Sequence, residues 1–159
     1  MKLFRYAAPA VVLLALSAAK ASAQATQDVA LEVQAINQLS FTGSPSLTIS
    51  TATAGSAPTS ATANASYAVT TNETNRKVTA QIDADTPSGV TLSASLAAPS
   101  GATSAGAVQL GTTAQDVVTG IGTVNASGLN VTYTLSATAA AGVVPSTSRT
   151  VTYTITAGA

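Results

Sequence analysis

The chain of 159 residues has no cysteine, no histidine and no tryptophan, and only 8% of its residues are charged. Without cysteine there is neither a disulfide nor a thiol nucleophile, so packing, main-chain hydrogen bonds or association must stabilise the fold. Without histidine, the residue most often used for base catalysis and zinc binding is missing. No glycine-rich phosphate loop opens a helix either. We therefore expect a non-enzymatic protein that binds no cofactor.

Long apolar runs are also absent, except for one at the start of the sequence that is typical of a secretory signal peptide. Lys2 and Arg5 form a basic n-region, residues 7–19 an apolar run, and residues 21–23 (Ala-Ser-Ala) a small-x-small cleavage motif. The run is shorter than the about 20 residues of a spanning helix, although an uncleaved anchor is the alternative. We expect residues 1–23 to be a signal peptide and the product to be secreted through the periplasm, extracellular or at the cell surface.

The mature chain, residues 24–159, is long enough for one domain and has no second run of spanning length. It keeps three basic against six acidic residues, a formal charge of −3. So few basic residues offer no stripe for phosphates and no patch for anionic lipid headgroups. Nucleic acid and membrane are therefore not expected partners.

Short runs in which apolar residues alternate with Thr, Ser or other polar residues recur along the mature chain. Such a period of two places one set of side chains on the core and the other on the opposite face of a strand. We predict about eight or nine strands, clearest at residues 29–35, 78–83, 90–96, 131–138 and 150–156, and weaker at 47–50, 66–71, 107–110 and 116–121.

Turn residues separate these runs, for example at residues 43–45, 85–89 and 125–128. The sequence shows no convincing 3.6-residue helical stripe, and a helix is possible only around residues 137–141. Residues 51–65, rich in Ala, Ser and Thr, predict a long flexible connection. The expected fold class is all-β, a single antiparallel immunoglobulin-like Greek-key β-sandwich.

Val-Thr-Tyr-Thr occurs twice, at Val131 and at Val151. A repeat of this kind is compatible with a solenoid, but the other segments share neither the period nor the spacing. Two sandwich strands in similar environments explain the match more simply.

Few side chains could carry chemistry. Asp83 and Asp85 are weak metal candidates, because two carboxylates two residues apart share a face of a strand. They precede the turn-forming residues 86–89, where Asp is ordinary, so a turn is the favoured interpretation. Lys77 is the one mature lysine that Ser-Lys catalysis would require, and its Asn-Arg-Lys setting is typical of a solvated strand end.

The rows of Thr along the strands allow a different class of function. Thr-x-Thr arrays on flat sheets can hold sugars or order water at ice, whereas Thr is also a natural residue for the solvent face of any strand. Few aromatics are available for stacking on sugar rings. Surface glycans are possible partners. Four Asn-x-Ser/Thr triplets, at Asn64, Asn72, Asn125 and Asn130, are treated as background.

The segment after the predicted cleavage site suggests association. Residues 24–38 contain the alternating side chains Val29, Leu31, Val33 and Ala35, only five residues from the new N-terminus. Such a segment can pair within its own chain, or complete the sheet of another copy by strand addition. Head-to-tail addition is heterologous, so it polymerises.

With its signal peptide, Thr/Ala/Gly-rich β-domain, N-terminal alternating segment and C-terminal strand at residues 149–156, the chain resembles secreted fimbrial or pilus-type subunits. The disulfide and penultimate Tyr of many chaperone-usher subunits are missing; Tyr153 is seventh from the end. The resemblance implies self-association into surface filaments. We expect a structural filament subunit, and the alternative is a monomeric carbohydrate-binding or adhesive module.

Overall fold

The computed structural model describes residues 23–158. Apart from Ala23, the predicted signal peptide lies outside the described residues. The chain divides into two units, one ending at Glu32 and one beginning at Val33, and every strand of the described residues belongs to the second. Residues 23–32 have no regular secondary structure.

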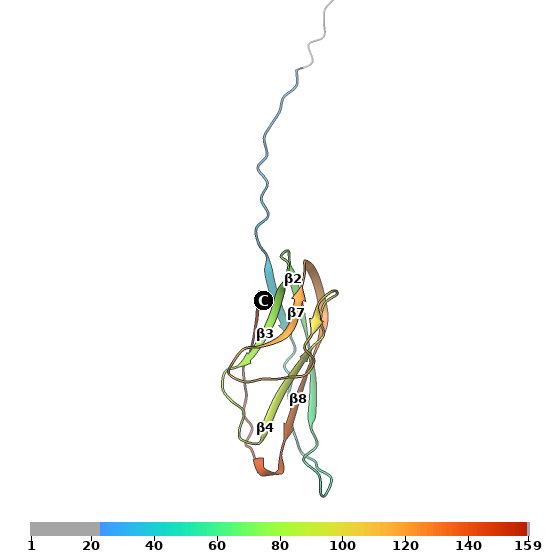
Figure 1. The fold of residues 1–159 in the computed structure, drawn as a ribbon, viewed down its shortest axis with the longest axis vertical. Coiled ribbons are helices and arrows are strands. Elements are labelled where there is room, and N and C mark those ends of the chain that lie inside the picture. The colour runs from blue at the N-terminus through green and yellow to red at the C-terminus, as the bar shows by residue number, and fades with distance from the viewer. Residues whose placement is uncertain (1–22, 159) are drawn as a thin grey trace, which may run out of the picture. The chain divides into compact units, whose positions relative to one another are not determined.

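The second unit is all-β and consists of two antiparallel sheets in a sandwich-like arrangement (Figure 1). One sheet has the strand order β1-β2-β8-β4-β6 and the other β5-β7-β3-β9. The described strands are β1 (Asn37–Thr42), β2 (Ala61–Thr71), β3 (Arg76–Ile82), β4 (Val90–Leu96), β5 (Thr103–Ser104), β6 (Val108–Gln109), β7 (Gln115–Ile121), β8 (Val124–Ala137) and β9 (Val151–Ala157).

Alternation of side chains decides which residues face the core. In β3, Val78, Ala80 and Ile82 are fully buried, whereas the intervening Thr79 and Gln81 are only partly buried. A strand turns successive side chains to opposite faces, so a run of this pattern becomes stable once a second sheet covers its apolar face. The outward Thr and Ser then need no partner other than water.

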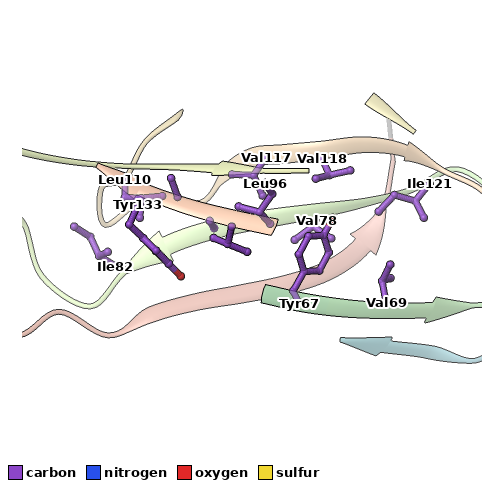
Figure 2. Close-up of a cluster of buried hydrophobic side chains, with 13 residues drawn as sticks. Tyr67, Val69, Val78, Ile82, Leu96, Leu110, Val117, Val118, Ile121 and Tyr133 are labelled. Atoms are coloured by element: carbon purple, nitrogen blue, oxygen red, sulfur yellow. The ribbon is translucent and has the colours of Figure 1, made fainter. Parts of the chain in front are cut away.

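The core lies between the two sheets and draws on both (Figure 2). Tyr67 and Val69 of β2 and Val78 of β3 belong to this core, and Leu96 of β4 has none of its surface exposed. Small aliphatic residues supply most of the remaining volume. The buried apolar residues are Tyr67, Val69, Val78, Ala80, Ile82, Ala94, Leu96, Leu110, Val117, Val118, Ile121, Val131 and Tyr133.

Most of the predicted strands are confirmed, and the differences are local. Residues 47–50 form no strand, and residues 107–110 contribute only the short β6. The predicted flexible connection at residues 51–65 is partly wrong, because β2 already begins at Ala61 and Ala52 forms a bridge with Pro58. Alanine gives little hydrophobic signal, yet residues 61–65 pair with β8. The helix considered at residues 137–141 is a single 3-10 turn, Ala139–Ala141.

The two Val-Thr-Tyr-Thr segments lie in β8 and β9, which belong to different sheets. Their tyrosines meet across the sandwich, with the hydroxyl oxygens of Tyr133 and Tyr153 2.8 Å apart. A two-sheet arrangement excludes the solenoid. The match between the segments thus reflects two strands that face a common core.

Candidate assembly site

Residues 29–35, which we call the donor segment, do not form the predicted strand. Val29, Leu31 and Val33 are 70%, 90% and 83% exposed, and Ala35 is exposed as well. No strand among the described residues pairs with the segment, so its main chain lacks the ladder of hydrogen bonds that a strand requires. The prediction of a strand within the chain is therefore wrong, although the alternating apolar side chains are present and unburied.

The first strand of the described residues is instead β1, which the predicted strand pattern did not include. Its inward apolar residues are only Leu39 and Phe41, with Ser40 between them and Gln38 before them. Phe41 pairs with Tyr67 of β2, and Leu39 with Val69. Because this run is short and contains a single aromatic residue, the longer alternation just before it gave a stronger signal.

Strand β9 lies at the edge of its sheet. It pairs with β3 along one side, and along its other side no strand of the described chain pairs with it. Its inward residues Val151, Tyr153 and Ile155 are half-buried, and Thr152 and Thr154 are exposed. An open edge of this kind offers unpaired N–H and C=O groups to an additional strand.

A cleft of about 1300 Å³ is lined by residues of β1, β4, β8 and β9 and of the loops beside them. Its apolar lining comes from four strands of the two sheets, and the loops around Leu47 and Val144 contribute further apolar residues. Arg149 is the charged residue of this lining. The strand residues that line the cleft with apolar or aromatic side chains are Leu39 and Phe41 (β1), Val90 and Leu92 (β4), Tyr133, Leu135 and Ala137 (β8), and Val151 and Tyr153 (β9).

Aromatic rings join the two sheets at this cleft. The ring of Phe41 stacks on Tyr153 with centroids 4.0 Å apart, and on Tyr67 at 5.4 Å. Tyr67 donates a hydrogen bond of 2.5 Å to the carbonyl oxygen of Ala97. Tyr133 and Tyr153 satisfy one another, so the polar ends of these buried rings have partners.

Burial raises the pKa of all three tyrosines, that of Tyr67 to about 12. The pKa of Tyr153 is raised further by its hydrogen bond with Tyr133. In the unfolded chain tyrosine ionises near pH 10, so above this pH the unfolded state loses protons that the folded state still holds. We expect the free energy of unfolding to be independent of these groups below about pH 10 and to fall by about 1.4 kcal/mol per pH unit for each tyrosine above it.

Urea unfolding at stepwise higher pH, with tyrosinate absorbance recorded in parallel, checks this expectation. The Tyr67→Phe variant should show a shallower decline because it lacks one of the ionising groups. Tyrosines that ionise near pH 10 while the chain stays folded would contradict the burial argument.

The residues considered for metal binding and catalysis form other contacts. Asp83 Oδ1 accepts hydrogen bonds from the main-chain N of Ala84 and of Thr150, each at 3.0 Å, and so joins the end of β3 to the start of β9. The carbonyl oxygen of Asp85 accepts two bonds from Arg149. Lys77 pairs with Asp116 at 3.0 Å. Within residues 23–158, no group of three His, Cys, Asp or Glu side chains could hold a metal ion.

No protein family, curated protein or solved structure matches the chain. None of the helices in the described part is long and apolar enough to cross a membrane.

Proposed function

We propose that this chain is a secreted, non-enzymatic structural subunit of a surface filament, assembled by β-strand addition. The donor segment of one copy pairs with β9 of the next and places its apolar side chains in the cleft. One observation carries the proposal: the chain has alternating apolar side chains that are exposed and that no described strand pairs with, and it has an open strand edge beside an apolar cleft.

The order of strands within the two sheets supports this proposal, because it resembles that of an immunoglobulin-like Greek-key sandwich that lacks one edge strand. Such a domain has strands A-B-E-D in one sheet and C-F-G in the other. The first four strands of one sheet, β1-β2-β8-β4, correspond to A-B-E-D. The neighbouring strands β3 and β9 of the other sheet correspond to C and F. No strand of the described residues occupies the position of G, beside β9. The proposed filament supplies this seventh strand from a second copy.

The chemistry of the donor segment is compatible with that position. A strand along β9 would satisfy main-chain groups of the edge, and alternate side chains would point into the cleft. Val29, Leu31 and Val33 are aliphatic, as are most of the strand residues that line the cleft. Burying these three side chains contributes about 5–9 kcal/mol before the cost of association. Ala30 and Glu32 would then face solvent.

The proposal is tested with the mature chain, a deletion variant lacking residues 24–35, and a synthetic peptide of residues 24–36. We expect filaments of the mature chain by negative-stain electron microscopy, whereas the deletion variant should be a monomer that binds the peptide. A peptide of equal composition in which the apolar residues no longer alternate is the control and should not bind. A monomeric mature chain together with a deletion variant that ignores the peptide would refute strand addition.

Glycan binding is the second candidate, because the outer face of β2 and β8 presents an uncharged array of hydroxyl and amide groups. Thr132 Oγ1 donates to Asn64 Oδ1 at 2.9 Å and accepts from Asn130 Nδ2 at 2.9 Å. Binding of neutral glycans by the deletion variant, which cannot donate a strand, is the measurement that separates this function from assembly.

A further inference from the structure

The turn between β2 and β3 contacts the main chain immediately before β1. Asn72 Oδ1 accepts a hydrogen bond of 2.7 Å from the main-chain N of Ile36, and Asn72 Nδ2 donates one of 2.8 Å to the carbonyl oxygen of Gln34. The main-chain N of Asn72 also donates to the carbonyl oxygen of Ile36 at 3.2 Å. We call these three bonds the clasp. A single residue thus holds the main chain on both sides of Ala35.

A polar cluster holds the turn against the start of β1. Thr71 Oγ1 donates to Asn37 Oδ1 at 2.8 Å, and the main-chain N of Glu73 donates to Thr71 Oγ1 at 3.1 Å. The Glu73 carboxylate accepts a hydrogen bond from Asn37 Nδ2 and forms an ion pair with Arg76. Both contacts lower the pKa of Glu73, and the hydrogen bond from Asn37 has a larger effect than the one from Arg76. Asn72 is therefore presented to residues 34 and 36 from a fixed position.

The clasp sets the direction in which the chain approaches β1. A side-chain amide offers the same donor and acceptor as a peptide group, so Asn72 extends the β1-β2 ladder one step beyond Thr71. Residues 34–36 are thereby tied to the end of β2. For the donor segment to reach the cleft of its own chain, the main chain would have to reverse direction before β1, in a hairpin loop of two to five residues. The residues available for such a loop are those that the clasp holds.

Such a constraint matters because the donor segment of the same chain competes for the cleft more effectively than the donor segment of a second copy. Attachment to the same chain gives a segment an effective concentration in the millimolar range, above that of a second copy in dilute solution. Without a constraint, each chain would therefore tend to fill its own cleft. Nothing further could then be added to its β9 edge.

We propose that the clasp prevents the donor segment from closing onto its own chain, and so keeps the cleft open for a second copy. This inference rests on the proposed function. It adds that the clasp determines whether the cleft binds the chain's own donor segment or that of a second copy. Asn72 is a positioning residue in this scheme, because it holds the main chain before β1 and does not contact the cleft.

The test compares Asn72→Ala with Thr74→Ala, an exposed residue of the same turn, in the mature chain. We expect Asn72→Ala to remain largely monomeric, to form filaments about tenfold more slowly, and to fail to bind the added peptide of residues 24–36 because its own segment occupies the cleft. Thr74→Ala should assemble and bind as the parent does. Asn72→Asp keeps the acceptor for Ile36 and loses the donor to Gln34, and we expect it to assemble at an intermediate rate.

Two results would overturn the inference, and they are distinguishable. If the deletion variant binds the peptide while Asn72→Ala and Asn72→Asp assemble at the parent's rate, strand addition stands and the clasp has no role in it. If the deletion variant does not bind the peptide, the proposed function fails and the inference fails with it. Should Asn72→Ala not fold, Asn72→Asp provides the same comparison with the turn's main acceptor retained.

Discussion

Leu31→Asp should abolish filament formation and leave the folded domain unchanged. Leu31 is 90% exposed in the single chain, so its replacement removes no intramolecular packing, and surface changes of this kind usually alter stability by less than about 0.5 kcal/mol. In the proposed filament the same position lies in an apolar cleft, where an unpaired carboxylate costs several kcal/mol. We expect peptide binding to weaken at least about a hundredfold and filaments to disappear from negative-stain images.

Ala30→Asp is the matched control for this variant. It introduces the same charge one residue earlier, at an exposed position that a strand turns to the opposite face. Filaments should therefore form with Ala30→Asp. If neither variant forms filaments, the added charge alone blocks assembly and the alternation of side chains plays no part. If both variants form filaments, residue 31 does not enter the cleft.

Leu96→Ala should cause a large loss of stability. Leu96 ends β4 with no surface exposed and packs between the two sheets. Truncating a buried leucine costs about 2–5 kcal/mol through lost burial and the cavity left behind. Typical domains are stable by only about 5–15 kcal/mol, and this chain has no disulfide to restrain its unfolded state. We expect a lower urea midpoint with an unchanged slope.

Ser95→Ala provides the comparison at the adjacent residue. Ser95 is partly exposed on the outer face of β4, so we expect a change below about 0.5 kcal/mol. A small effect of Leu96→Ala would mean that the sheets close over the missing side chain. In that case the core between β4 and β7 would be less rigid than its burial indicates.

The strands of the fold could largely be predicted from the sequence, because most of them alternate over seven or more residues. Between Val131 and Leu135 of β8 and between Val151 and Ile155 of β9, inward Val, Tyr, Leu or Ile alternate with outward Thr. The prediction failed where this contrast weakens. Ala63 and Ala65 are too small to mark the beginning of β2, and they become strand residues only because β8 pairs with them. Such pairing over long sequence separation is decided by tertiary context.

The candidate site shows a different limit of sequence reasoning. The alternation of Val29, Leu31 and Val33 was visible in the sequence, but whether the segment pairs within the chain depends on where β1 and β9 lie. Asn72 was visible only as part of an Asn-x-Thr triplet. Its contacts with Gln34 and Ile36 carried no signal, since an Asn in a turn is common and these contacts join positions far apart in sequence. The open edge of β9 likewise follows from the strand order, which no local pattern encodes.

The clasp also has a mechanical consequence for the proposed filament. Only Ile36 separates the donor segment from β1, and the main chain on both sides of Ala35 is bound to Asn72. Successive copies would thus be joined by a very short connection, whereas flexible linkers of several residues let neighbouring domains move independently. Bending at each joint would require the clasp to open. Such a filament would behave as an elastic rod and transmit torque and tension from one copy to the next.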